Sequence, residues 1–562
     1  MPGSVTSITA QDIATLNVGR DISTIFRRVP GVVANNIDQG DTGNGFRMRG
    51  FATQGTHGAD TAIYVDGVPQ NMPSSQGGAG HGPAFLEWLT GDMIDTVDVV
   101  KGPVSALYGD QNRAGSVAIS TREGGAATPS SAAVTLESYG GRRASLTLSG
   151  DNGTVRSLLV ADRFHLDGFR NGAQTDRGNA FWKLSTTLGA GLYSLRASYY
   201  TADYAGAGYL SLPAIDAGLS PRSTQYNLAG FGEATRKTLV FNRRPAQGEA
   251  GWFATAYAED FERSRAITTS TTQHTYGYDK RNILGARYDR FDYDLVNRKL
   301  PAASTGYQGS AFTPKFGAVW QALPGLEVFL NSAQGFRSPA AEQISASGSL
   351  GPLGAPGGKI NAGIAPSKVT SHDLGITARP GAGWTVAGAV YAIRNDDEII
   401  NTAPDVYLAS GQTTRRGVEL DLRYQISPDF NAYLSYGRIL RAQLDNPTPG
   451  TGARLSVPAH TWKAGAGQRR ALGSGHLALN GDVYVTAANP YYMGTPSRQR
   501  AMPTYVRYDV KAAYDVGTWQ AALFATFQPH ETASDIAYGS AAGLLVSTVP
   551  RTQAGASLRH FF

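Results

Sequence analysis

Apolar and polar side chains alternate along most of the chain after residue 125, in segments of about ten residues. In residues 417–425, one face would carry Val418, Leu420, Leu422 and Tyr424, and the other Glu419, Asp421, Arg423 and Gln425. Residues 193–199 and 506–514 repeat the pattern. Because successive side chains of a strand point to opposite faces, this alternation predicts membrane-spanning strands with one apolar and one polar face. The strands of a soluble β-sandwich also alternate, but their polar faces rarely carry charged residues in one strand after another.

The connections between these segments alternate between short and long. The short ones cover residues 151–153, 189–191, 323–325, 380–383, 427–429, 472–475 and 516–517. The long ones cover residues 204–235, 338–368, 442–457, 489–502 and 529–549. This rhythm is typical of bacterial membrane barrels, which have tight turns at one rim and larger loops at the other. Counting strands in this way gives about 20 of them, with the least regular pattern around residues 272–291.

Residues 1–125 follow a different pattern. Short helices are predicted near residues 12–16 and 21–28, the second ending before Pro30. Short strands are predicted at residues 46–49, 62–65, 96–100 and 116–121, with glycine-rich turns between them. We therefore expect two domains, a compact α/β unit over residues 1–125 and a large antiparallel transmembrane β-barrel over residues 126–562.

The composition and the motifs of the sequence argue against several classes of function. The chain has no cysteine, which excludes disulfides, thiolate zinc sites and a cysteine nucleophile. The formal net charge of +6 is scattered, with no run of Lys and Arg longer than two, so the sequence does not favour nucleic-acid binding. It contains no nucleophile elbow, phosphate-binding P-loop or H-E-x-x-H motif, and we expect no enzymatic activity and no cofactor.

Several segments resemble TonB-dependent outer-membrane receptors, in the order in which that family has them. In the first 125 residues they are PGSVTSITAQDI (2–13), GFRMRGF (45–51), AIYVDGVP (62–69), IDTVDVVKGPVSALYG (94–109) and AGSVAISTR (114–122). In the second part they are GARYDRFDY (285–293) and NSAQGFRSP (331–339). The C-terminal residues SLRHFF resemble the closing strand of bacterial outer-membrane barrels. The resemblance covers essentially the whole chain.

This resemblance implies a plug domain inside a barrel of 22 strands, whereas the alternation gives about 20. Over residues 262–281 the pattern is short of two strands: either the sequence is shortened there, or two strands with weak alternation are present. The family's TonB-contacting segment lies upstream of the plug, where this sequence begins, and no signal peptide is visible. A signal peptide and a TonB-contacting segment upstream of Met1 would favour transport, whereas a gene that truly starts at Met1 without either would favour a defective or decayed receptor.

The function implied by the resemblance is active import of a scarce, bulky solute across the bacterial outer membrane. The family favours an iron–siderophore or another metal chelate as substrate, and the TonB energy-transducing complex of the inner membrane as partner. Contact with outer-membrane lipid and a monomeric state are also expected. The alternative is a passive porin-like channel or a surface-receptor barrel without energy coupling; an outer-membrane enzyme is a third, disfavoured class.

Charged residues of the plug are candidates for holding it in the barrel. Arg47 and Arg49 alternate with apolar residues, which would turn both guanidinium groups to one side of a strand. Glu419 and Asp421 are candidate partners on the lumen side of the barrel, because Arg forms bidentate pairs with carboxylates. The alternative is that these arginines are solvated. We interpret residues 396–398, Asp-Asp-Glu, as a solvated acidic loop, with calcium binding as the alternative.

Two regions could contact a substrate. In the plug loops the candidates are His57, Asp60, Asn71, Met72 and His81, which could touch a metal chelate or a soft metal. Their spacing matches no fixed metal motif, so a direct metal site stays unknown, and exposed histidines without a ligand are the alternative. In the outer loops Tyr491, Tyr492 and Arg498 would suit a planar anionic ligand. An aromatic girdle with lipid-phosphate contacts is the alternative there.

Overall fold

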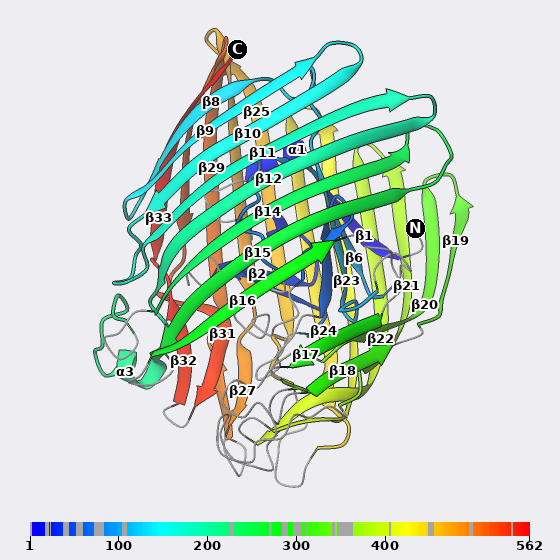
Figure 1. Ribbon diagram of the computed structural model, residues 1–562, viewed down its shortest axis with the longest axis vertical. Helices are drawn as coiled ribbons and strands as arrows, with labels where there is room; N and C mark the ends of the chain where they lie inside the picture. The colour runs from blue at the N-terminus through cyan, green and yellow to red at the C-terminus, as the bar shows by residue number, and fades with distance from the viewer. Residues whose placement is uncertain are drawn as a thin grey trace.

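The computed structural model describes most of the chain. The described residues are 3–16, 22, 24–36, 44–51, 60–71, 84–103, 109–224, 230–246, 248–268, 273–283, 290–295, 305–310, 313–339, 343–344, 364–403, 406–447, 455–493, 498–540 and 543–562. The chain forms a small N-terminal unit, drawn in blue in Figure 1, surrounded by a large barrel that the rest of the chain builds.

The N-terminal unit, here called the plug, is built on a five-stranded sheet in the order β1-β6-β7-β4-β5. Its elements are β1 (Ser4–Thr9), α1 (Ala10–Leu16), α2 (Thr24–Arg27), β2 (Val32–Asn36), β3 (Asn44–Met48), β4 (Thr61–Val65), β5 (Val68–Pro69), β6 (Ile94–Lys101) and β7 (Gly115–Thr121). β2 and β3 form a separate antiparallel pair, and β4 and β7 are parallel. The predicted helices and strands of this region are all present, and the second helix is shorter than predicted.

Local sequence explains where the first helix begins. Thr9 and Asp12 form a reciprocal cap: the Thr9 N–H donates to Asp12 Oδ2 at 2.8 Å, and the Asp12 N–H donates to Thr9 Oγ1 at 3.2 Å. Such a pair satisfies backbone donors that have no partner inside the helix. On the inner face of the helix, Ile13 and Leu16 are buried in the hydrophobic core of the plug.

The barrel strands follow one another around the ring. They are β8 (Ser131–Glu137), β9 (Gly141–Asp151), β10 (Val155–Leu166), β11 (Thr175–Leu188), β12 (Gly191–Gly206), β14 (Gly230–Pro245), β15 (Ala254–Thr268), β16 (Gln273–Ile283), β19 (Lys315–Leu323), β20 (Leu326–Arg337), β21 (Ser367–Gly381), β22 (Trp384–Ala403), β23 (Val406–Ser427), β24 (Phe430–Leu444), β25 (His460–Leu472), β26 (Gly475–Thr486), β29 (Tyr505–Val516), β30 (Trp519–Phe527) and β33 (Thr552–Phe561). Within the described residues these are nineteen strands, near the predicted number.

The antiparallel alternation is interrupted at one place in the ring. Eighteen successive antiparallel pairings lead from β19 through β33 and β8 to β16. Because eighteen is an even number of reversals, β16 and β19 run in the same direction. The two strands between them in sequence, β17 (Arg290–Leu295) and β18 (Thr305–Ser310), form a sheet of their own. The interruption follows directly after the region where sequence alternation predicted missing strands.

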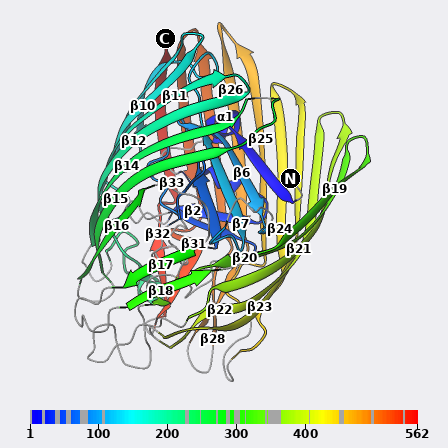
Figure 2. The ribbon, with the colours of Figure 1, turned by 45° about the vertical axis from the view of Figure 1, so that its right-hand side comes forward.

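The two ends of the barrel differ. All seven predicted short turns connect consecutive barrel strands, and they lie at one end, here called the turn rim, which also holds the C-terminus (Figure 1). The opposite end, the loop rim, carries the long connections with β13 (Leu210–Ser211), α3 (Leu212–Asp216), β27 (Asn489–Met493), β28 (Arg498–Met502), β31 (Thr532–Ser540) and β32 (Gly543–Thr548). Figure 2 shows the plug at the level of the barrel strands, with its sheet inside the ring.

The strand faces are sorted as the alternation predicted. Large apolar side chains are exposed on the outside, among them Trp182, Leu195, Leu239, Leu374 and Leu420. Outward-facing aromatic pairs lie at two heights. Trp384 and Tyr424 stack near the turn rim with ring centroids 4.5 Å apart, and Tyr436 and Trp462 stack further toward the loop rim at 4.1 Å. Tyr436 lies opposite Leu420 in the strand register, so this second pair belongs to the apolar outer band that is typical of membrane barrels.

Among the described residues, no helix has both the length and the apolar character needed to cross a membrane.

Candidate functional site

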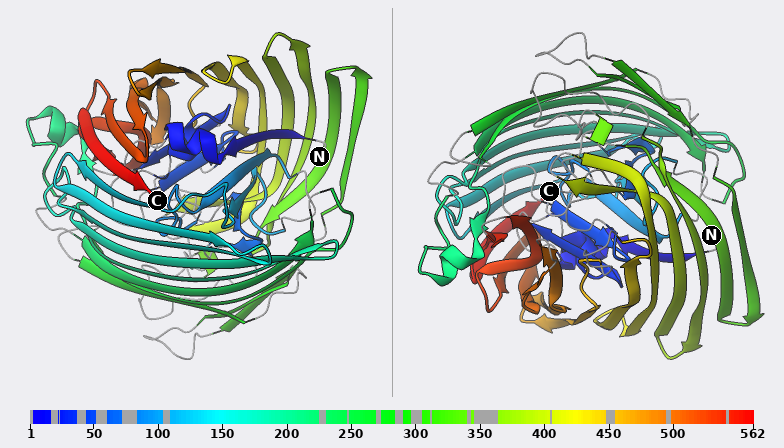
Figure 3. Two further views of the ribbon diagram at one scale, coloured as in Figure 1. Left: turned by 90° about the horizontal axis from the view of Figure 1, so that it is seen from above. Right: turned by 90° about the horizontal axis from the view of Figure 1, so that it is seen from below.

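The plug lies inside the ring, as the two end-on views in Figure 3 show. Against β12 and β15 the contact includes apolar packing: the ring centroid of Phe85 of the plug lies 5.6 Å from that of Tyr200 and 5.0 Å from that of Phe261. Against β21 to β26 the contact is mainly polar and charged. Because buried charges are costly unless paired, the buried charges at this contact need partners.

The central charged contact joins Arg49 and Lys101 of the plug to two barrel carboxylates. Arg49 Nη1 lies 2.5 Å from Asp373 Oδ1 of β21, and its Nε and Nη2 donate to the two oxygens of Glu419 of β23 at 3.3 and 3.2 Å. Lys101 Nζ donates to Glu419 Oε2 at 3.2 Å. The Arg49 guanidinium also lies 4.3 Å from the ring centroid of Tyr391. Two cations and two carboxylates thus form one buried cluster, here called the latch.

Burial and partner charges act in opposite directions on these cations. Burial alone would lower the pKa of Arg49, but Asp373 and Glu419 outweigh it and raise this pKa above its ordinary value. Burial lowers the pKa of the Lys101 ammonium, and Glu419 only partly offsets that effect. Lys101 is therefore the member of the latch whose charge depends most on keeping its carboxylate partner.

The predicted latch residues reach their positions in different ways. Arg49 lies beyond the end of β3 with a positive φ of 52°, so the strand alternation that was expected to orient it does not apply. Arg47, inside β3, is buried and lines a small pocket that Glu419 also lines. Asp421 accepts hydrogen bonds from Ser435 and Arg423 of the barrel instead. Sequence reasoning missed Asp373 and Lys101, although the inward position of Asp373 on an alternating strand was available to it.

A second charged contact lies beside the Pro-Gly-Val turn of the plug. Arg28 donates from Nε and Nη2 to the two oxygens of Asp482 at 3.0 and 3.1 Å, and Tyr433 donates to the same carboxylate at 2.7 Å. The turn itself touches the wall, because a Cβ added at Gly437 of β24 would lie 2.6 Å from the Gly31 Cα. Lys463 of β25 donates to the carbonyl oxygens of Val29 and Val32 around this turn.

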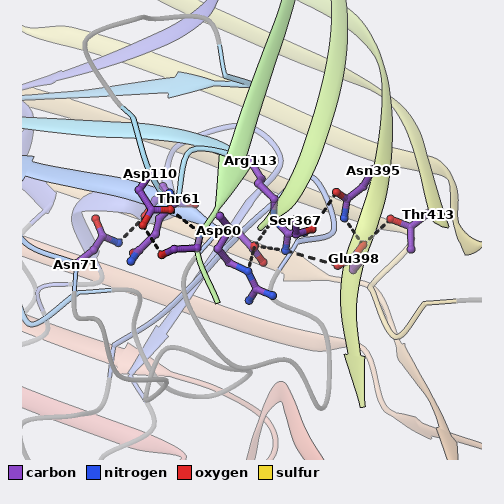
Figure 4. A network of polar contacts seen from close by, with 12 residues as sticks. Asp60, Thr61, Asn71, Asp110, Arg113, Ser367, Asn395, Glu398 and Thr413 are labelled. Atoms are coloured by element: carbon purple, nitrogen blue, oxygen red, sulfur yellow. Dashed lines mark hydrogen bonds and ion pairs between the residues drawn. The ribbon is translucent and has the colours of Figure 1, made fainter. Parts of the chain in front are cut away.

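A third network, drawn in Figure 4, joins the loop-rim end of the plug to β21, β22 and β23. Arg113 of the plug donates from Nε to Asp60 Oδ1 at 2.9 Å and from Nη1 to Ser367 Oγ at 2.6 Å. Its Nη2 lies 3.6 Å from Glu398 Oε1. Glu398 in turn accepts from Arg415 at 3.3 Å, and Arg415 Nε donates to the Gly50 carbonyl oxygen at 3.2 Å.

This network shows that one prediction, for Glu398, was wrong, and it shows where Asp60, a predicted substrate contact, lies. Glu398 was expected in a solvated acidic loop, but its side chain is buried and paired with Arg415, because the strand continues past it. Asp60, a predicted substrate contact, is buried beside Arg113 and lies 3.9 Å from Arg337 Nε. Burial alone would raise the pKa of Asp60, but the Arg113 and Arg337 guanidinium groups outweigh it and hold this pKa below its ordinary value. Asp60 is therefore a carboxylate in the native protein.

Two further contacts hold the opposite side and the turn-rim end of the plug. On the β12 wall, Arg196 Nε lies 2.9 Å from Asp66 Oδ2 of the plug. At the turn-rim end, Asp92 accepts from Arg559 at 2.8 Å and from Arg143 at 3.4 Å. Burial alone would raise the pKa of Asp92, but these two guanidinium groups outweigh it, so the pKa lies below its ordinary value.

The other predicted substrate contacts are only partly described. The Asn71 side chain donates to the Thr61 carbonyl oxygen at 2.8 Å and accepts from the Ile63 N–H at 2.6 Å. His57, Met72 and His81 lie outside the described residues. Tyr491, Tyr492 and Arg498 lie on the β27–β28 hairpin, where the backbone positions of Tyr492 and Gln499 are opposite each other. All of these roles in substrate binding stay predictions. Within the described residues, no group of three His, Asp or Glu side chains could hold a metal ion.

The arrangement closes the barrel with contacts that can be exchanged. The polar contacts between plug and wall are of a kind that water can replace, because water can donate and accept hydrogen bonds in place of either partner. A barrel with an apolar outer band and an internal domain held in it by charged contacts defines a plugged outer-membrane barrel.

Comparison with protein families leads to the same class. The family described as "TonB dependent receptor-like, beta-barrel" matches residues 102–527, and "TonB-dependent Receptor Plug Domain" matches residues 1–116. The chain belongs to the family of TonB-dependent receptors, and it is a barrel of the bacterial outer membrane.

Individual relatives are similar over shorter stretches. The ferric enterobactin receptor of Pseudomonas aeruginosa is 34% identical over 132 residues, which are 23% of this chain and 17% of that receptor. The ferrienterobactin receptor of Escherichia coli is 35% identical over 128 residues, 22% of this chain and 17% of that receptor. These curated relatives are receptors. The matched stretch thus spans less than a fifth of each.

Solved structures share the whole fold at low sequence identity. The ferric yersiniabactin uptake receptor FyuA from Yersinia pestis superposes with a TM-score of 0.76 at 15% identity, covering 100% of this chain and 98% of that one. FpvA of Pseudomonas aeruginosa, solved with bound pyoverdines, gives 0.69 at 13% identity, covering 100% and 86%. At such identities the likeness concerns the fold alone.

Proposed function

We propose that this protein imports a ferric siderophore, or another bulky metal chelate, across the outer membrane, using energy delivered by the inner-membrane TonB complex. The substrate would bind on the loop-rim side of the plug. Force on the plug would then separate it from the wall and open a path through the barrel. The protein acts alone in the membrane as a monomer and performs no covalent chemistry.

The observation that carries this proposal is the way in which the plug is fixed. Its main wall contacts are the latch, the Arg28–Asp482 pair and the Arg113–Glu398 network, all charged and all inside the ring. A permanent seal would be more stable with apolar side chains, since burying ion pairs offers little net stability. Charged contacts can be exchanged for water, so they suit a plug that must leave its seat and return.

The choice of substrate class rests on the relatives. The matched receptors are named for ferric enterobactin and ferrienterobactin, and FyuA for ferric yersiniabactin. The plug loops with His57, Asp60, Asn71, Met72 and His81, and the hairpin with Tyr491, Tyr492 and Arg498, remain the predicted contacts of the chelate. Latch roles for Arg47, Arg49, Glu419 and Asp421 belong to the same proposal.

The alternative is a passive channel or a surface receptor in the same fold. In that case the plug would stay in place and solute would pass around it without energy. Liposomes containing the full chain would swell at rates set only by solute size if this alternative holds. The proposal predicts no swelling with sugars larger than a disaccharide, because the plug closes the lumen.

The substrate is tested by uptake. Cells that lack the gene and cells that carry it would be given labelled ferric enterobactin, a labelled ferric complex of another siderophore class, nickel and cobalamin. Gene-dependent uptake of one ferric complex supports the proposal and names the substrate class. Gene-dependent uptake of cobalamin or nickel alone would overturn the ferric-siderophore assignment and leave the transport mechanism to be tested separately.

A further inference from the structure

The outward faces of β21 to β25 change abruptly from apolar to basic. In the middle of these strands the exposed outward positions are apolar: Ile376 and Leu374 on β21, Val390 on β22, Leu420 on β23, Leu434 on β24 and Trp462 on β25. Beyond Ala392, Val418 and Tyr436, the outward positions toward the loop rim include Arg394 on β22, Arg416 on β23, and Arg438 and Arg441 on β24, all exposed and here called the basic belt. His372 of β21 and His460 of β25 flank it.

The belt lies at the height expected for the membrane surface. Arg416 is eight residues along its strand from Tyr424, a member of the aromatic pair near the turn rim. At about 3.3 Å per residue and a tilt of about 40°, eight residues rise roughly 20 Å, close to the roughly 25 Å of an outer-membrane apolar band. The stacked pair Tyr436–Trp462 directly precedes Arg438 and His460 in the ring. The basic belt therefore meets the lipid headgroups of the loop-rim side.

Strand register brings these cations together. Arg416 and Arg441 are directly opposite each other across β23 and β24, and Arg438 is opposite His460 across β24 and β25. A register shift at Arg416/Gly417 accompanies an irregularity in β24 that leaves Leu440 and Arg441 both exposed. Like charges directly opposite each other on a sheet are unfavourable. The arrangement is explained if an anion outside the barrel is shared between them.

The protein supplies too few carboxylates for this belt. Arg394 has Asp396 at 3.1 Å, and Arg441 has Asp445 at 2.8 Å. Within the described part of the chain, neither Arg416 nor Arg438 has a carboxylate at ion-pair distance. These two guanidinium groups thus remain available to a ligand.

The opposite side of the barrel has the reverse charge. There the exposed outward residues at similar height include Asp203 of β12, Glu233 of β14 and Glu262 of β15. Two exposed cations on this side have carboxylate partners: Lys237 lies 3.8 Å from Asp260, and Arg163 lies 3.8 Å from Asp176. In Figure 3 these strands, in cyan to green, face the yellow strands β21 to β25 across the lumen. The basic belt is thus a local feature of one side.

We propose that the basic belt binds the phosphorylated headgroup of an outer-leaflet lipid, with Arg416 and Arg438 as its main phosphate contacts. Guanidinium groups form bidentate hydrogen bonds to phosphate, and their aliphatic stems lie along the apolar surface below. The lipid's chains cover the apolar faces of β22 to β24. This inference rests on the placement of the barrel in the outer membrane and not on the proposed transport activity.

The test measures binding of bis-phosphorylated lipid A to the full chain in detergent, by native mass spectrometry. Arg416→Gln/Arg438→Gln is the test variant, and Arg163→Gln/Lys237→Gln, two outward cations on the acidic side, is its matched control. Each basic residue near an anionic membrane surface contributes roughly fivefold in affinity, so the test variant is expected to bind about 25-fold more weakly. The control binds as the wild type does, and dephosphorylated lipid A binds weakly to all three proteins.

Contradicting results are equally defined. Equal affinity of the wild type and the test variant, equal losses in both variants, or undiminished binding of dephosphorylated lipid A would each overturn the proposal. Inorganic phosphate at millimolar concentration separates the sources of the anion: it should leave lipid A binding unchanged, and full competition would show a simple phosphate site instead. Heat-dependent mobility of the barrel on gels confirms that both variants are folded.

Discussion

The latch gives the sharpest prediction about how the plug is held. We expect Glu419→Gln to open the barrel far more readily than any exposed charge substitution does. Glutamine keeps the shape of the side chain but removes the charge that Arg49 and Lys101 share. Arg49 would keep its contact with Asp373, while Lys101 would lose the carboxylate that partly offsets its burial.

The magnitude follows from the charges of the cluster. Arg49, Lys101, Asp373 and Glu419 sum to zero, and all four side chains are almost fully buried. The variant therefore leaves one uncompensated positive charge inside the ring. Removing one partner of a buried ion pair costs about 3–5 kcal/mol. At 1.4 kcal/mol per tenfold change, the population with a displaced plug rises between about a hundredfold and a few thousandfold.

Conductance in planar bilayers measures that population. Single barrels of the wild type and the variant would be recorded across a urea series, because an unseated plug exposes the wide lumen. Glu327→Gln is the matched control, since Glu327 forms an exposed pair with Arg379 at 3.4 Å, and such pairs contribute about 0–1 kcal/mol. If Glu419→Gln opened at the same urea concentration as the control and the wild type, the latch would not hold the plug and this reasoning would be refuted.

Three further predictions concern other contacts. In Gly437→Ala, the added Cβ would lie 2.6 Å from the Gly31 Cα, and this overpacking should lower the free energy of unfolding by roughly 1–3 kcal/mol. The thermal midpoint should therefore fall, and the plug should become accessible to protease. Gly388→Ala is the control, because its Cβ would meet nothing closer than 3.7 Å, and its thermal midpoint should stay at the wild-type value. Equal falls of the midpoint in both variants would contradict the close approach of Gly437 to Gly31. Arg28→Gln should ease urea-induced opening by about 2 kcal/mol through loss of two hydrogen bonds to Asp482, and Arg379→Gln should not. Because the pKa of Asp92 is lowered in the folded protein, its contribution is complete above the ordinary Asp value of about 3.9 and is lost as the pH falls through the lowered pKa. The urea midpoint of the wild type should therefore fall below about pH 4, and that of Asp92→Asn should fall less; parallel curves would contradict this assignment.

Much of the fold can be predicted from the sequence because strand faces are sorted by solvent. Leu420 and Glu419 are neighbours in sequence with opposite surroundings, and the alternation alone places one toward lipid and the other toward the plug. The short turns follow from the same pattern, since a strand of fixed length must reverse at each surface. The region around β16 could not be predicted in this way, because the regular reversal of direction ends there.

The site was harder to predict because it depends on pairs that are far apart in sequence. Arg49 and Glu419 were both proposed as latch residues, but Asp373 and Lys101 gave no local signal beyond an alternating position and a turn. Glu398 was taken for a solvated residue because its two acidic neighbours suggest a loop, whereas the pairing with Arg415 requires the register of two strands. Such pairings are decided by the closed barrel and by the plug inside it.

Energy coupling is the central claim, and one measurement tests it most directly. The initial rate of uptake of the labelled ferric complex that the gene supports would be measured in cells before and after a protonophore dissipates the proton-motive force. The account predicts that uptake collapses while binding of the complex at the cell surface persists. Uptake that continues at the same rate without proton-motive force would contradict it and establish a passive channel.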